Sequence, residues 1–343
     1  MKLPEVDLSF IELYQLVIAP IKSRLLLTGI ELKVFDLLSE PRSSEDVADI
    51  LETHPENTRI FLDGLASFDL VEKKGGLYVN SIIAETFLVG ERSTFLGEFL
   101  AEQWRYTKPV LDDLTRLVVR GPPERGVEPE PESEAESEVD RASWAEAVAC
   151  YERSGIAQMV AGAIENLPEY PSFRKMLDLG GGPGLIGMAV VAAHPTMRGV
   201  VFDLPPVAKV AEKFVLDFGM KDRMEVVAGD FSFDPIGENY DLILASASLY
   251  PCKQDLDSVI EKIHNALNPA GVFASLHEGL TSEMTKPETM KLGWLPAELL
   301  GRDLAFKQGE IAASMRRSGF GSISSRTLDT PVGPLDLDVG RKL

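Results

Sequence analysis

The sequence predicts a doubly wound α/β domain, with a mostly parallel sheet and a terminal antiparallel hairpin, behind a mainly helical N-terminal domain. Three observations lead to this fold class. Between residues 141 and 320, apolar stretches of strand length alternate with helical segments, which is typical of a parallel sheet covered on both faces. Helical apolar periods dominate residues 1–120, and an acidic stretch at 121–140 separates the two regions. A chain of 343 residues also exceeds one ordinary hydrophobic core.

The N-terminal domain, residues 1–120, begins with helices. Apolar periods between residues 10 and 40 predict two of them. A short helix with an acidic first turn follows, and Ser43 or Ser44 can cap it. Thr53, with Glu56 three residues later, gives the next helix the spacing of a capping box.

Two short strands follow these helices. The stretch LVEKKGGLYVN at 70–80 predicts a hairpin, and helices followed by such a hairpin are the arrangement of a winged helix. Residues 1–100 hold nine Lys/Arg and seventeen Asp/Glu, a balance of 9 − 17 = −8, which disfavours contact with nucleic-acid phosphates. We therefore expect the surplus apolar surface of the first helices to form the symmetric interface of a homodimer.

The segment 121–140 stands out by composition. It holds eight acidic residues, four prolines and one arginine, and it has no apolar period. Repulsion between like charges and the prolines favour an extended chain. We interpret this segment as an acidic linker or loop between the domains.

The second domain, residues 141–343, is expected to start with a helix at 141–167. Apolar runs predict strands at 175–179, 198–203, 224–228, 240–245 and 271–277. Helices are expected between them at 185–193, 206–218 and 255–267. The tail predicts a hairpin formed by 322–330 and 334–343.

Composition excludes several classes of protein. The net charge of −20 disfavours a nucleic-acid partner and leaves a small molecule as the expected one. No uninterrupted apolar run reaches the roughly 18 residues of a membrane span, and the N-terminus lacks the features of a signal peptide, so we expect a cytoplasmic protein without a membrane partner. Cys150 and Cys252 lie far apart, and the four histidines are scattered, so neither a disulfide framework nor a metal site is expected.

The central motif is LDLGGGPGLIG at 177–187, where a buried strand runs through glycines into a helix. Glycine lets the backbone approach a ligand, and the helix N-terminus offers free N–H groups. Residues 182–187 also satisfy GxGxxG, the fingerprint of Rossmann-like dinucleotide sites, which alone is a weak signal.

Three acids at strand ends distinguish between the possible ligands. Asp178 precedes the glycines, where a carboxylate can hold an ammonium group but would repel a pyrophosphate. Asp203 closes the second strand, suited to ribose hydroxyls. Asp230, with Phe231 beside it, closes the third strand, suited to the amino group and ring of adenine. Together they favour S-adenosylmethionine over a dinucleotide.

These motifs resemble the small-molecule O-methyltransferase family, which includes caffeate, acetylserotonin and antibiotic-tailoring enzymes. The resemblance covers nearly the whole chain and implies a class I methyltransferase domain behind an N-terminal winged-helix dimerisation domain. It is carried by LDLGGGPG (177–184), FDLP (202–205), GDF (229–231), YDLILAS (240–246), LNPAGVF (267–273) and SGF (318–320). The cofactor residues that it implies are Gly180 and Gly182 at the methionine end, Asp203 with Leu204 at the ribose, Asp230 and Phe231 at the adenine, and Ser246 after the fourth strand, beside Asp178.

The catalytic loop departs from the family pattern. The family usually has LHDW there, with a histidine that deprotonates the acceptor, whereas this chain has SLYPCKQD (248–255) and places Tyr250 at that position. A neutral tyrosine is a poor base at neutral pH, because its reference pKa is about 10. By resemblance, Glu278 is the acid that orients the histidine and a plausible substitute base, and Asp303 is a second such acid.

Several functions therefore remain open. The first is methyl transfer by single displacement to a small-molecule acceptor, through O, S or C. The second is a family member that binds the cofactor without transferring methyl, as relatives that act in decarboxylation or hydroxylation do. The third is a non-enzymatic winged-helix sensor of S-adenosylmethionine, which the acidic N-terminal domain disfavours.

Overall fold

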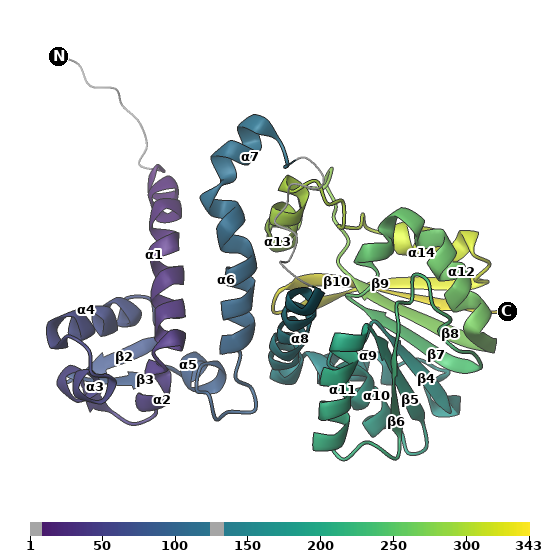
Figure 1. The fold of residues 1–343 in the computed structure, drawn as a ribbon, viewed down its shortest axis with the longest axis horizontal. Helices are drawn as coiled ribbons and strands as arrows, with labels where there is room; N and C mark the ends of the chain where they lie inside the picture. The colour runs from purple at the N-terminus through teal and green to yellow at the C-terminus, as the bar shows by residue number, and fades with distance from the viewer. Residues whose placement is uncertain (1–8, 124–133) are drawn as a thin grey trace. The chain divides into compact units, whose positions relative to one another are not determined.

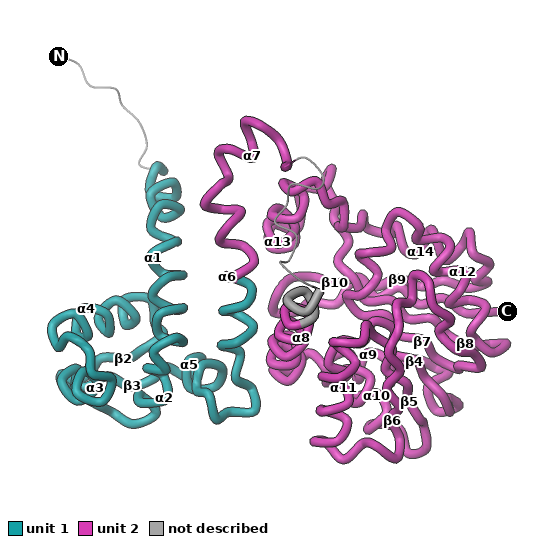
Figure 2. The backbone as a smooth tube through the Cα atoms, viewed as in Figure 1, with its two compact units in different colours: residues 1–103 teal, residues 104–343 magenta. Residues whose placement is uncertain are grey.

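The computed structural model describes residues 9–123 and 134–343 and divides into two compact units, residues 1–103 and 104–343 (Figure 1, Figure 2). The boundary between the units falls inside helix α6, Gly97–Asp112, whereas the first domain predicted from the sequence extends to residue 120. A boundary within a continuous helix leaves no change of composition for a sequence to reveal.

The first unit is mainly helical, as predicted. Its three short strands form an antiparallel sheet in the order β1-β3-β2. The β2–β3 turn places Gly75 and Gly76 at φ 61° and 83°, which a two-residue hairpin turn requires. In chain order the elements before α6 are α1 (Ile11–Glu31), α2 (Val34–Leu37), β1 (Arg42–Ser43), α3 (Ser44–Leu51), α4 (Pro55–Ala66), β2 (Val71–Lys74), β3 (Leu77–Asn80) and α5 (Ile82–Phe87).

The predicted cap of α4 is wrong, whereas of the two caps predicted as alternatives for α3, Ser43 and Ser44, the structure has Ser43. The N-cap of α4 is His54, whose side chain accepts a backbone N–H of the first turn, and not Thr53. Pro55 starts the helix because its missing N–H needs no partner at that position, so the residue before it becomes the cap. The Thr53 hydroxyl instead lies 2.6 Å from the Thr58 hydroxyl.

Helix α1 exposes apolar side chains. Leu16 and Val17 are 70% and 73% exposed. Within the described ranges, α1 alone is long and apolar enough by length and composition to cross a membrane, and 6% of its most apolar window is buried. One such helix near the N-terminus is a weak indication of a span, because buried core helices of soluble proteins and signal sequences also meet this criterion.

The second unit is built on a seven-stranded sheet in the order β6-β5-β4-β7-β8-β10-β9, with β10 antiparallel to both of its neighbours. The parallel strands and terminal hairpin confirm the predicted fold class. Its strands are β4 (Lys175–Leu179), β5 (Arg198–Asp203), β6 (Met224–Ala228), β7 (Tyr240–Ser246), β8 (Leu267–His277), β9 (Ser322–Thr330) and β10 (Gly333–Arg341). Its helices after α6 are α7 (Leu114–Arg120), α8 (Glu134–Tyr151), η1 (Glu152–Ile156), α9 (Ala157–Glu165), η2 (Tyr170–Ser172), α10 (Leu185–Ala193), α11 (Pro205–Asp217), η3 (Tyr250–Asp255), α12 (Leu256–Ala266), α13 (Glu288–Leu299) and α14 (Glu310–Arg317).

Both faces of the central strands of this sheet are buried, whereas the edge strand β9 is largely exposed. Successive residues of β4 contribute to different cores, since Met176 packs with α9 and α10 and Leu177 packs with α12. Side chains alternate between the faces of a strand, so a strand covered on both sides has a continuous apolar sequence. This burial fixes the carboxyl ends of the strands, where the candidate site lies.

The acidic segment 121–140 is only partly described, because residues 124–133 lie outside the described ranges. Helix α8 begins at Glu134, seven residues before the helix start expected at 141. The prolines of the segment end at Pro131, and the glutamates and alanine after it are good helix formers that also suit the first turn of a helix.

Candidate active site

A glycine-rich turn lies where the order of the strands reverses. β4 ends at Leu179 and α10 begins at Leu185, and β4 lies between β5 on one side and β7 on the other. Ligands of doubly wound sheets bind at such a switch point. Gly180, Gly182 and Gly184 have φ values of 64°, 57° and 79°, which residues with a side chain rarely adopt. The turn therefore depends on glycine.

This turn contacts the loops that follow β6 and β7. A Cβ added to Gly180 would lie 2.5 Å from Cβ of Ser248 and 3.2 Å from Cε1 of Phe231. The Ser248 hydroxyl donates to the Leu179 carbonyl at 2.7 Å. Gly180 and Phe231, both singled out in the sequence, thus lie close together. The space at position 180 is too small for any residue with a side chain.

Asp178 lies beneath the turn with 1% of its surface exposed. Its Oδ2 accepts the N–H of Gly187, in the first turns of α10, at 3.0 Å. Burial raises the pKa of Asp178 to about 7, against the lowering effect of the Gly187 hydrogen bond, and the charge of Asp203 adds to the rise. Asp178 therefore titrates near neutral pH.

Asp203, at the end of β5, connects two backbone segments. Its Oδ2 accepts the N–H of Gly182 at 2.8 Å and its Oδ1 accepts the N–H of Leu204 at 2.7 Å. Burial raises the pKa of Asp203, and these two hydrogen bonds oppose the rise. The sequence-predicted residues Gly182, Asp203 and Leu204 are thus joined in one cluster.

The other predicted cofactor residues follow β6 and end β7. The Asp230 carboxylate accepts the N–H of Ser232 at 2.9 Å, within its own turn. Lys262 donates to the carbonyl of Phe231 at 2.8 Å and holds this loop against α12. Ser246 is the last residue of β7 and is partly buried. The hydrogen bonds of Asp230 thus stay within its own loop.

One buried acid near the turn was missed by the sequence analysis. Glu152 opens the π-helical turn η1 and is 5% exposed, and its Oε2 has no hydrogen-bond partner among the described residues. Burial raises the pKa of Glu152 well above its usual range, and the charge of Asp178 raises it further. The available signal was its place on an apolar helical face, between Ala149 and Ile156, where a charge is unexpected.

On the other side of the switch point, Tyr250 and Glu278 form the candidate catalytic pair. The Tyr250 hydroxyl donates to Oε2 of Glu278, and Nε1 of Trp294 donates to Oε1. The ring centroids of Tyr250 and Trp294 are 4.6 Å apart. Burial raises the pKa of both Tyr250 and Glu278, so the phenol is neutral at physiological pH. Trp294 was not singled out in the sequence, because α13 comes near Glu278 only in the folded chain.

His277, adjacent to Glu278, holds the loop after β7. Its Nε2 accepts the backbone N–H groups of Ser248 and Leu249, both at 3.0 Å, and its Nδ1 lies 2.9 Å from the Ser275 hydroxyl. Burial lowers the pKa of His277 to about 3. Since Nε2 accepts, the proton is on Nδ1 and the ring is neutral, so His277 positions the loop that carries Tyr250.

Two further residues considered from the sequence lie outside this cluster. The Asp303 side chain is 66% exposed and forms an ion pair with Lys253, so the structure does not bring it to Tyr250 or Glu278. Cys252 is 4% exposed, with Sγ 3.2 Å from the hydroxyl of Ser232, and burial raises its thiol pKa. A thiol held protonated in this way is a packing residue.

The fold and the two parts of the site invite comparison with known proteins. Residues 141–292 match the family model described as an O-methyltransferase domain, and residues 14–90 match that of an O-methyltransferase dimerisation domain.

Two relatives match over nearly their full lengths. The N,N-dimethyltransferase OxyT of Streptomyces rimosus is 28% identical, over 94% of this chain and 93% of its own. The tetracenomycin polyketide synthesis 8-O-methyl transferase TcmO of Streptomyces glaucescens is 26% identical, over 96% of both. Among solved structures, human N-acetylserotonin methyltransferase in complex with SAM has a TM-score of 0.82 at 23% identity, over 100% of this chain and 99% of that one.

Proposed function

The chain belongs to the O-methyltransferase family, and from this premise we propose which of its residues carry methyl transfer to a small-molecule acceptor. The cofactor is S-adenosylmethionine. The family does not fix the acceptor atom, because one relative is named an N,N-dimethyltransferase and another an 8-O-methyl transferase. The observation that carries the proposal is the glycine turn at the switch point, surrounded by buried acids on one side and the Tyr250–Glu278 pair on the other.

S-Adenosylmethionine supplies a methyl group on a sulfonium, which is a strong electrophile. The chain offers space for such a ligand at the turn, since a Cβ added to Gly182 would meet no atom within 4 Å. A cation also suits the buried acids, which no side-chain cation pairs with in the described structure. We assign Asp178, Gly180 and Gly182 to the methionine end, Asp203 and Leu204 to the ribose, Asp230 and Phe231 to the adenine, and Ser246 to the mouth of β7.

Tyr250 and Glu278 form a proton relay in this proposal. The Tyr250 oxygen accepts the proton of the acceptor while the phenol proton passes to Oε2 of Glu278, so the tyrosine is neutral before and after the transfer. This removes the difficulty that a lone tyrosine is a poor base. Burial favours a protonated Glu278, because it raises the pKa of that carboxylate. Trp294 holds the other oxygen and orients the carboxylate.

Acceptors that ionise easily need less of this relay. A thiolate or an acidic phenol carries no proton to remove, so Glu278 would matter less for it than for an ordinary hydroxyl. Tyr250 in the place of the usual histidine also keeps a second function open, in which the cofactor is bound and no methyl is transferred.

We assign the N-terminal unit to homodimer formation through α1. The match to the dimerisation domain and the exposure of Leu16 and Val17 support this, because an exposed apolar helix gains free energy by pairing with its copy. We further propose a winged-helix arrangement for residues 34–80, from their order of helices and hairpin, and a cytoplasmic location. The acidic segment 121–140 falls within the second unit and does not connect the two units. Sedimentation of the full-length protein as a monomer at micromolar concentration would contradict the dimer.

The test of the function is transfer of a labelled methyl group. The full-length protein is incubated with methyl-labelled S-adenosylmethionine and a panel of phenols, amines, thiols and activated ring carbons. Label in any acceptor supports methyl transfer. Conversion of an acceptor without label would favour the second function, and absence of binding to both the cofactor and S-adenosylhomocysteine would end the proposal.

A further inference from the structure

We propose that Glu152 binds the amino group of the amino-acid part of S-adenosylmethionine and so selects ligands that carry a cation there. The inference rests on the proposed function, since it assigns a role to one more residue of the same cofactor site. It starts from Glu152 Oε2, a carboxylate oxygen that is buried and has no hydrogen-bond partner among the described residues.

A buried carboxylate in this condition is unfavourable. Removing a charged or polar group from water without a partner costs on the order of several kcal/mol, so such groups are normally paired or hydrogen-bonded. A buried carboxylate without a partner beside a ligand site is explained if the ligand supplies the missing hydrogen-bond donor.

The position of Glu152 directs it at the cofactor turn. The backbone N–H groups of Ile186 and Leu185, at the start of α10, interact with its carboxylate and lower its pKa against the effect of burial. Those residues directly follow the glycine turn. The π-helical turn η1 begins at Glu152 and is kinked at Gly155, with φ of 117°, where α8 gives way to α9. Such turns re-aim side chains and are frequent at functional sites.

Among the described residues, no cationic side chain pairs with this acid. Its neighbour Arg153 points elsewhere, with Nε donating to the Ala149 carbonyl at 3.3 Å and its guanidinium 5.9 Å from the ring centroid of Phe214. In the described part of the chain, no lysine, arginine or histidine forms an ion pair with Glu152.

The neighbouring charges select the sign of the ligand group. The charges of Asp178 and Asp203 both act on Glu152 and raise its pKa. A positively charged ligand group favours the ionised form of these three acids, whereas a carboxylate or a phosphate opposes their ionisation. The amino-acid part of the cofactor carries one group of each sign, so these acids favour the amino group over the carboxylate.

The experiment compares ligands that differ only in that part, by calorimetry with full-length protein. S-Adenosylhomocysteine is measured beside its desamino analogue, its decarboxylated analogue and 5′-methylthioadenosine, which lacks the amino-acid part. For the wild type we expect loss of the amino group to weaken binding about 10- to 100-fold, as for hydrogen bonds to charged groups, and loss of the carboxylate to weaken it less.

Measuring the same ligands with the variant Glu152→Gln combines the change in the ligand with the change in the residue, as in a double-mutant cycle. The variant should bind S-adenosylhomocysteine about 10- to 100-fold more weakly than the wild type, bind 5′-methylthioadenosine unchanged, and no longer distinguish S-adenosylhomocysteine from its desamino analogue. Glu146→Gln, on the exposed side of the preceding helix α8, is the matched control and should behave as wild type.

Several results would overturn the inference. Equal weakening of all ligands in Glu152→Gln would make the residue merely structural, and no weakening would make it irrelevant. If the variant does not fold, the wild-type comparison decides, because equal affinity for S-adenosylhomocysteine and its desamino analogue contradicts the assignment. Failure of the wild type to bind S-adenosylhomocysteine at all would instead contradict the proposed function.

Discussion

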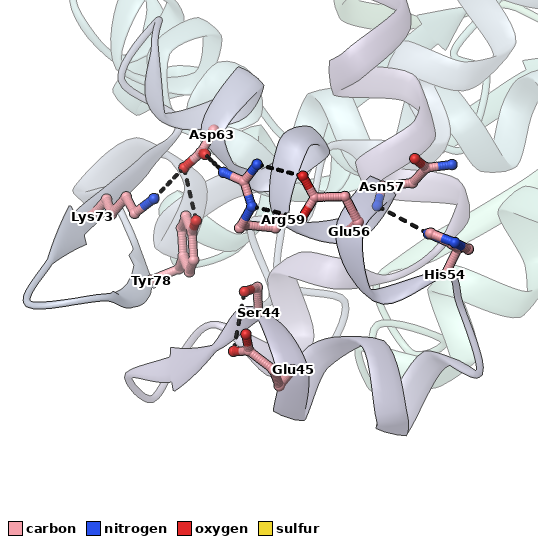
Figure 3. A network of polar contacts seen from close by, with 9 residues as sticks. All are labelled: Ser44, Glu45, His54, Glu56, Asn57, Arg59, Asp63, Lys73 and Tyr78. Carbon is pink, nitrogen blue, oxygen red and sulfur yellow. Dashed lines mark hydrogen bonds and ion pairs between the residues drawn. The ribbon is translucent and has the colours of Figure 1, made fainter.

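Carboxylates in the two units of this molecule have opposite surroundings. In the first unit Asp63 accepts hydrogen bonds from Lys73 Nζ at 2.6 Å, from the Tyr78 hydroxyl at 2.7 Å and from Arg59 Nη1 at 2.8 Å (Figure 3). Lys73 and Tyr78 lower its pKa. At the cofactor turn of the second unit, Glu152 and Asp178 are buried beside each other, and burial raises the pKa of both.

The contrast in pKa distinguishes carboxylates that stabilise the fold, such as Asp63, from carboxylates that are available to a ligand, such as Glu152 and Asp178. A carboxylate with a lowered pKa favours the folded state at neutral pH, whereas a buried one with a raised pKa disfavours it. Glu278 is intermediate, because it is buried like Asp178 but partnered by neutral donors, Tyr250 and Trp294. Neutral donors leave the carboxylate able to accept a proton, as a relay requires.

The largest expected effect concerns Asp178 without ligand. A pKa of about 7 in the folded state, against 3.8 for the free side chain, means that the native state holds the proton more tightly. The free energy of unfolding therefore falls as pH rises from about 4 to 7, by up to about 4 kcal/mol from this residue. Asp178→Asn keeps an acceptor for the Gly187 N–H and removes this titration. In urea unfolding, the free energy of unfolding should fall less between pH 5 and pH 8 in the variant than in the wild type. An equal fall in both proteins would refute the titration assigned to Asp178.

Glu278→Gln tests whether the intermediate carboxylate acts in chemistry. Glutamine keeps an oxygen for a hydrogen bond but cannot take up the proton, so single-turnover methyl transfer to a hydroxyl acceptor should slow about 100-fold. Cofactor affinity should stay unchanged, since Glu278 lies on the other side of the switch point from the acids at the glycine turn. A variant that retains half of the rate would show that Glu278 has only a structural role.

Tyr250→Phe should have a smaller effect, about tenfold for a hydroxyl acceptor, because a water molecule can partly replace the relay oxygen. The ring remains and keeps its packing against Trp294, at a centroid distance of 4.6 Å. A thiolate acceptor, which has no proton to give, serves as the control and should react at nearly the wild-type rate. An unchanged rate with the hydroxyl acceptor would exclude the Tyr250 hydroxyl as a participant.

Asp63→Asn should have the smallest effect, and of opposite sign to that at Asp178. Because the pKa of Asp63 is lowered in the folded state, its stabilisation is present above pH of about 4 and is lost as the pH falls below that. Its side chain is 33% exposed, so solvent screening limits the expected loss at pH 7 to about 1 kcal/mol. Chemical denaturation measures this, and methyl transfer by the variant should match the wild type. A stability gain would contradict the contrast between the two units.

Much of the fold could be predicted because its signals are local. Continuous apolar runs gave the parallel strands, and the glycines and strand-end acids marked the turn at Gly180–Gly184. One prediction from a local signal was wrong. The cap of α4 is one residue later than the predicted Thr53, because Pro55 is the first residue of the helix. Asp303 was grouped with the catalytic residues by resemblance to the family, but its carboxylate pairs with Lys253.

The sequence by itself determined the layered fold, the family and the residues that follow each strand, because these depend on periods and spacings of a few residues. Only the tertiary structure decided which side chains meet. The charge of Asp178 acts on Glu152 across 26 positions of sequence, and Trp294 reaches Glu278 from another helix. Such contacts depend on how helices pack over the sheet, and packing sums many weak interactions that no single segment of sequence contains.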